Sequence, residues 1–132
     1  MKDEKKKMFF IKIAYWLGIA ADGLWAVGLF FPSVFGLLVG SSDFTPNLQT
    51  RQIMLIAGTL MTGWTFLLLW AIRSPMERRF VILLTAVPVV SGLFLVSLNG
   101  FLAGNTTLIW VLIKNPILII AMINSYILAG KA

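Results

Sequence analysis

The sequence contains no cysteine and no histidine, and only 12% of its 132 residues are charged. Without cysteine there are no disulfides, thiol nucleophiles or thiolate metal sites. Without histidine the usual haem and zinc ligand is missing, as is the usual general base near neutral pH. No paired carboxylates are expected at one depth either, so we expect no enzyme activity, no metal and no cofactor. Ordinary soluble domains carry about 25% charged residues, so a soluble globule is also excluded.

Apolar residues are abundant instead, at 59% of the chain with a mean hydropathy of +0.92. A helix needs about 20 apolar residues to cross a hydrocarbon core about 30 Å thick. Four runs reach that length, at about residues 8–31, 52–72, 80–102 and 107–129. Too little sequence remains for a separate soluble domain. We therefore predict one all-α integral membrane domain over residues 1–132, an antiparallel bundle of four transmembrane helices.

The basic residues indicate how this bundle is oriented. Those expected at one end of the spans are Lys2, Lys5, Lys6, Lys7, Arg73, Arg78, Arg79 and Lys131. Only Arg51 is expected at the other end. Cytoplasmic loops are enriched in Lys and Arg, so both termini are predicted to be cytoplasmic in a cell (plasma) membrane. Because these cations lie beside spans and form no basic face, we expect no nucleic-acid partner.

The loops carry signals for helix ends. After the first span, "PSVFGLLVG" predicts a short amphipathic, interfacial or re-entrant helix over residues 33–39. Thr45 followed by Pro46 resembles a helix cap, so the second helix is expected to begin before its apolar run. In "SPME", Ser74 and Glu77 have the spacing of a capping box, which predicts a helix beginning near Ser74.

Two ionisable residues lie deep within the predicted spans. Asp22 is placed about 13 Å, and Lys114 about 10 Å, below the same outer surface, at a rise of about 1.5 Å per helical residue. A lone charge at the centre of a membrane costs about 2.5–3.5 kcal/mol on insertion scales, so pairing the two removes much of the penalty. Asp22 also lies on a stripe of small residues that favours close helix packing. We predict that Asp22 and Lys114 face each other.

Further polar residues and two prolines are candidates for the same site. Thr85, Gly92 and Asn99 share one side of the third helix at heptad spacing. Pro116 cannot donate to the carbonyl of Leu112, and its ring leaves that acceptor in need of a partner. The full set of ligand-binding or ion-pair candidates is Asp22, Lys114, Asn115, Thr59, Thr62, Ser91 and Asn99, with helix kinks expected at Pro88 and Pro116.

Two interpretations of this polar site stay open, a purely structural ion pair and a functional pocket. The favoured function is a non-catalytic protein that binds a lipid or other ligand, or that serves as an accessory subunit. The alternative is an oligomeric proton- or ion-linked transporter or channel in which Asp22 titrates. Expected partners are membrane lipids and either further copies of the chain or a larger membrane complex.

Two stretches resemble the DoxX-like superfamily of small four-helix membrane proteins. They are "FPSVFGLLVG" after the first span and "RQIMLIAGTLMTGW", which begins at Arg51. The resemblance implies four spans with both ends inside, and it brings no catalytic signature. The segment Lys114-Asn115-Pro116 departs from that pattern.

Overall fold

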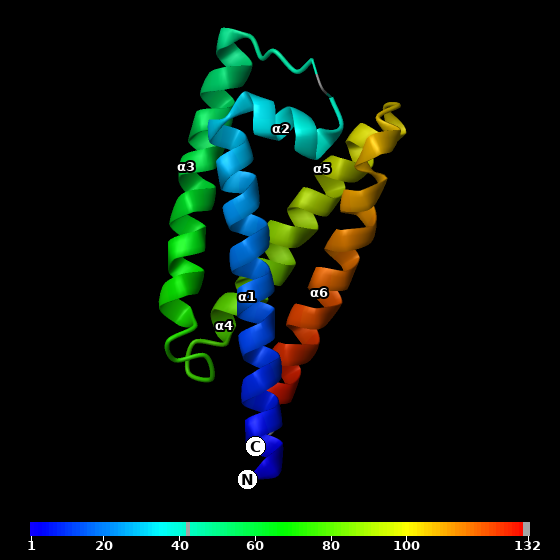
Figure 1. Ribbon diagram of the computed structural model, residues 1–132. Coiled ribbons are helices and arrows are strands. Elements are labelled where there is room, and N and C mark those ends of the chain that lie inside the picture. The colour runs from blue at the N-terminus through cyan, green and yellow to red at the C-terminus, as the bar shows by residue number, and fades with distance from the viewer. Residues whose placement is uncertain (42, 131–132) are drawn as a thin grey trace.

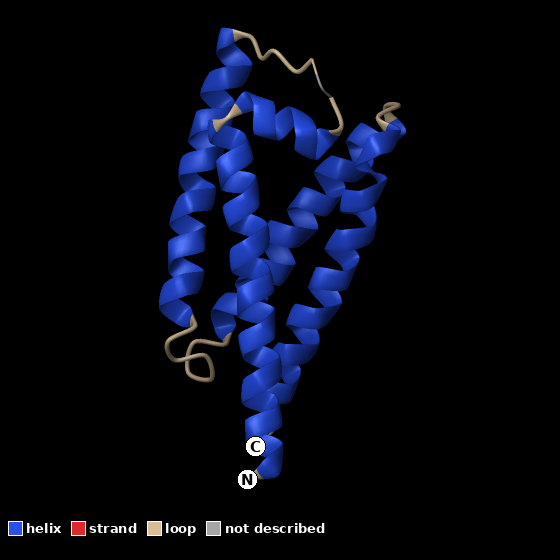
Figure 2. Cartoon of the chain, viewed as in Figure 1, coloured by secondary structure: helices blue, strands red, loops and turns tan. Residues whose placement is uncertain are grey.

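The computed structural model describes residues 1–41 and 43–130. Lys131, counted above among the cytoplasmic cations, lies outside these residues. The elements in chain order are α1 (Lys2–Phe30), α2 (Pro32–Val39), α3 (Leu48–Ala71), α4 (Phe80–Leu84), the π-helix η1 (Thr85–Val90), α5 (Ser91–Leu102), the 3₁₀-helix η2 (Thr106–Leu108) and α6 (Ile109–Gly130). Strands are absent from these described residues (Figure 2), so the all-α prediction is confirmed.

Four helical segments are long and apolar enough to cross a membrane. They cover Lys2–Phe30, Leu48–Ala71, Phe80–Leu102 and Thr106–Gly130. These match the four predicted spans, except that the first two helices begin several residues earlier than predicted. The protein is thus a multi-pass membrane protein. The short helix predicted after the first span is also confirmed, as α2.

The helix α3 begins before its apolar run, as predicted, but a different residue caps it. The side chain of Asn47 accepts a hydrogen bond from the backbone nitrogen of Thr50, at 2.8 Å. This satisfies one of the free donors of the first helical turn. Thr45 lies two residues too early for that role.

The capping box predicted at Ser74 does not form, and α4 begins only at Phe80. The intervening residues form turns, in which the side chain and the backbone carbonyl of Arg78 bond to neighbouring helices. Arg78 Nη1 donates to the carbonyl of Trp70 at 2.6 Å, and the guanidinium carbon lies 3.7 Å from the centre of the Trp70 ring. The Tyr15 hydroxyl donates to the Arg78 carbonyl at 2.7 Å. These bonds anchor the loop to α1 and α3 and delay the helix.

The third span changes its helical winding part-way along. Pro88 lies inside η1, between the α-helices α4 and α5. Proline has no backbone N–H, and a π-bulge is one way in which a helix accommodates the loss. The Ser91 hydroxyl donates to the carbonyl of Ala86 at 3.0 Å, five residues back. The side chain of Ser91 therefore supports the widened turn.

The helices pack tightly at one end of the molecule. There α1 lies between α3 and α6, and the start of α1 and the end of α6 lie at this end (Figure 1). The core includes Ile11 and Tyr15 of α1, Leu68 of α3, Ile82 of α4 and Met122 of α6, all almost completely buried. At the opposite end, α2 crosses from the end of α1 toward α5 and α6.

Candidate functional site

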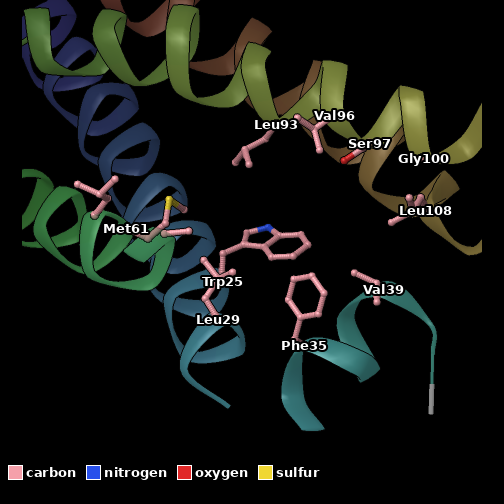
Figure 3. Close-up of a pocket in the computed structure, with 12 residues that line it drawn as sticks. Trp25, Leu29, Phe35, Val39, Met61, Leu93, Val96, Ser97, Gly100 and Leu108 are labelled. Atoms are coloured by element: carbon pink, nitrogen blue, oxygen red, sulfur yellow. The ribbon is translucent and has the colours of Figure 1, made fainter. Parts of the chain in front are cut away.

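A cavity of about 500 Å³ lies beneath α2, at the end of the molecule away from the termini. Figure 3 shows the indole of Trp25 and the ring of Phe35 among its lining side chains. The lining residues are Trp25, Leu29, Phe35, Val39, Ala57, Leu60, Met61, Leu93, Val96, Ser97, Gly100 and Leu108. Ser97 carries the one polar side chain besides the indole of Trp25. The cavity thus suits an apolar guest.

The paths of the long helices account for the cavity. α1 packs along α3 and against α6, and α5 packs on α6, but α3 and α5 make almost no direct contact among the described residues. Beyond η1, α5 leans away from α3 (Figure 1). A widened helical turn is a common cause of such a change in direction. The space between the two helices is bounded by side chains and covered by α2.

The short helix α2 is held in place at its C-terminal end by the start of the last span. Trp110 Nε1 donates to the carbonyl of Leu38 at 3.0 Å, and Thr107 Oγ1 donates to the carbonyl of Val39 at 2.7 Å. The next residue, Gly40, has a φ of 72°, and an added Cβ would approach Thr107 to 2.6 Å. Glycine is therefore needed here, both for the backbone conformation and for the close approach.

At the other end of α2, Arg51 stabilises the end of α1. Its Nη1 donates to the carbonyl of Leu29 at 2.9 Å, and its Nη2 donates to the carbonyl of Phe30. The last carbonyls of a helix lack partners within the helix, and a cation is favourable beside them. This role explains a lone arginine at an end of the spans that is otherwise poor in basic residues.

Beside the cavity, two polar side chains are buried between helices. Asp22 of α1 is 2% exposed and Asn115 of α6 is 1% exposed. Neither Asp22 Oδ2 nor Asn115 Nδ2 has a hydrogen-bond partner among the described residues. Each unpaired buried polar atom lowers the folding stability by about 1–3 kcal/mol. An unpaired acceptor and an unpaired donor in one interface therefore need a physical explanation.

Lys114 lies against two aromatic rings. Its Nζ is 5.6 Å from the centre of the Trp25 ring and 5.1 Å from that of Trp110. The two indoles are stacked, with centroids 6.3 Å apart and planes 6° from parallel. Cations over tryptophan faces are stabilised by about 0.5–2 kcal/mol.

In the structure, the predicted Asp22–Lys114 pair makes no hydrogen bond through Asp22 Oδ2. Asp22 Oδ2 accepts no hydrogen bond, so Lys114 does not donate to it. Lys114 nevertheless lies beside Trp25, which is three residues from Asp22 along α1. They belong to one cluster, in which tryptophan rings hold the ammonium.

The remaining candidates are not brought into this cluster. Thr59 and Thr62 donate to the carbonyls four residues earlier in α3, and Thr59 is exposed. Ser91 supports η1, as described above. Asn99 is exposed on α5. Hydroxyl bonds of this kind satisfy the donor of the side chain within its own helix.

Both predicted kink prolines lie within helical segments. Pro88 is exposed within η1, and Pro116 lies inside α6, which continues from Ile109 to Gly130. Asn115, next to Pro116, is one of the two buried residues with an unpaired polar atom.

The apolar cavity was not predicted from the sequence. Its residues come from α1, α2, α3, α5 and η2, and none of them belongs to the polar set singled out above. One signal was present, the apolar first half of the loop after the first span, which becomes the covering helix. No protein-family model, curated protein or solved structure matches this chain.

Proposed function

We propose that this protein binds an acyl chain of a membrane lipid in the cavity beneath α2. The cavity volume carries the proposal, since pockets that hold small ligands typically measure about 300–1,000 Å³. Its walls are almost wholly hydrocarbon and aromatic. Such a site offers no set of directed hydrogen bonds for a polar ligand.

An acyl chain is favoured over other apolar guests by the surroundings of the protein. Many large apolar side chains of the spans are exposed, among them Ile56 and Phe66 of α3 and Leu95 and Val96 of α5. In a membrane these side chains contact lipid tails. Because α3 and α5 diverge beside the cavity, lipid tails are the molecules nearest to it.

The packing of the molecule at the end away from the cavity favours ligand binding over transport. A transporter needs a route to both surfaces. Here Ile11, Tyr15, Leu68 and Ile82 are at most 1% exposed and form a dry core at the end that holds the termini. The buried hydroxyls of Thr85 and Ser125 at that end each donate to the carbonyl four residues earlier. The transport alternative, with Asp22 as the titrating group, has no comparable support.

The proposal includes the orientation of the molecule. In an antiparallel bundle with both termini in the cytoplasm, the cavity and α2 lie in the outer half of a cell membrane. The basic residues near the termini fit this orientation. The resemblance to the DoxX-like superfamily and the assembly into oligomers or larger complexes stay predictions.

The proposal is tested by filling the cavity. Ala57 lines it, and Ala57→Phe places a ring in the space of the guest. Native mass spectrometry of protein taken from lipid nanodiscs measures the fraction that retains a lipid. We expect Ala57→Phe to weaken retention about tenfold, which corresponds to about 1.4 kcal/mol.

The matched control is Ala20→Phe, an alanine-to-phenylalanine change at an exposed position of α1. It should leave lipid retention unchanged. Equal retention by the wild-type protein and both variants would show that lipid binds only to the outer surface, and it would refute the proposal.

A further inference from the structure

The register of α1 against α6 places Asp22 and Asn115 within about one helical turn of each other along the interface. A Cβ added to Gly18 would approach Met122 Cε to 3.1 Å, and the Trp25 ring lies 5.6 Å from Lys114 Nζ. Asp22 lies between Gly18 and Trp25 along α1. Asn115 lies between Lys114 and Met122 along α6.

The two side chains have complementary needs. Asp22 Oδ2 can accept a hydrogen bond and Asn115 Nδ2 can donate one, yet neither has a partner among the described residues. They are both almost completely buried and therefore out of reach of bulk solvent. A group that joins them has to donate a hydrogen bond to Asp22 Oδ2 and accept one from Asn115 Nδ2.

We propose that one bound water molecule joins Asp22 to Asn115 across the interface of α1 and α6. A buried water typically makes about three hydrogen bonds to polar groups that otherwise lack partners. Here it donates to Asp22 Oδ2 and accepts from Asn115 Nδ2. Because water both donates and accepts, the bridge also forms if the amide of Asn115 is turned over.

The groups around this place argue against the two simplest other guests, a metal ion and an apolar molecule. A metal ion needs several oxygen or nitrogen ligands, and the described residues contain no group of three or more His, Cys, Asp or Glu side chains that could hold one. An apolar guest would leave both polar atoms unpaired, at the cost given above. The water site is separate from the acyl-chain cavity, and neither Asp22 nor Asn115 lines that cavity.

The direct test is an experimental structure of the full chain at a resolution that shows ordered water. The expected result is a water peak about 2.7–3.2 Å from both Asp22 Oδ2 and Asn115 Nδ2. A direct hydrogen bond between the two side chains would overturn the proposal. So would bonds from each side chain to other protein groups with no water between them.

Substitutions provide a second measurement. Asn115→Leu removes one partner of the water and should raise the unfolded fraction in a denaturing-detergent titration about tenfold. Asn124→Leu is the matched control, because Asn124 is exposed on the same helix and should be neutral. In the double variant Asp22→Leu with Asn115→Leu, the unfolded fraction should rise by less than the product of the increases in the two single variants. Strictly independent effects would contradict the bridge.

Discussion

At the scale of single residues, the site is defined by how three polar groups are accommodated in an apolar interior. Asp22 and Asn115 are buried, whereas Lys114 is half-buried against two indoles. The tryptophans supply π faces where a soluble protein would supply water. The ammonium is thus stabilised without direct contact to Asp22 Oδ2.

A double-mutant cycle measures the coupling between Asp22 and Lys114. We expect Asp22→Asn and Lys114→Met each to destabilise the protein in detergent, since each leaves the other group without its opposite charge. The double variant should lose less than the sum, by about 0.5–3 kcal/mol. Losses that add to within about 0.5 kcal/mol would show that the two charges act independently.

The sequence predicts a depth for these charges from helical rise and membrane thickness, and that depth stays a prediction. It did not predict their partners. Which atoms meet depends on rotamers and on neighbouring rings, and the place of Lys114 between Trp25 and Trp110 is decided by those rings.

At the scale of elements, the π-helix η1 shows why a face predicted by spacing failed. Thr85, Gly92 and Asn99 share a side only in an unbroken α-helix. The wider turn of η1 rotates the residues that follow, so Thr85 is buried, Asn99 is exposed, and Ser97 faces the cavity. Pro88 was the available signal, since a proline inside a helix forces some local change.

Among the contacts between elements, the attachment of α2 to the start of the last span is the one whose loss is easiest to observe. Thr107→Val keeps the shape of the side chain but removes the hydroxyl, whose one proton is shared between the Val39 carbonyl and Asn105 Oδ1. We expect a spin label at Leu37→Cys, an exposed position of α2, to become more mobile. The chain has no native cysteine, so the label is unique.

Thr106→Val is the control for this experiment, because Thr106 precedes Thr107 and is likewise exposed in η2. It should leave the label as in the wild-type protein. An unchanged label in Thr107→Val as well would mean that Trp110 alone holds α2.

At the scale of the whole molecule, the chain is tightly packed near its termini and open beneath α2. The number and position of the spans could be predicted because the bilayer demands long apolar runs. The opening could not, since it depends on how far α3 and α5 diverge after η1.

The proposed orientation is testable with introduced cysteines. Glu77 and Asn105 are exposed and lie in loops at opposite ends of the spans. In intact cells, a thiol reagent that cannot cross membranes should label Asn105→Cys and leave Glu77→Cys unlabelled until the cells are opened. The reverse pattern would place the cavity on the cytoplasmic side.

The stacked indoles also give the molecule an optical property. Trp25 lines the cavity with one part of its ring system, and it meets Trp110 and the Lys114 ammonium as well. Indole emission depends on ring neighbours and on nearby charge. If the proposed guest shifts Trp25, the fluorescence of this stacked pair changes, and emission then reports whether the cavity is filled.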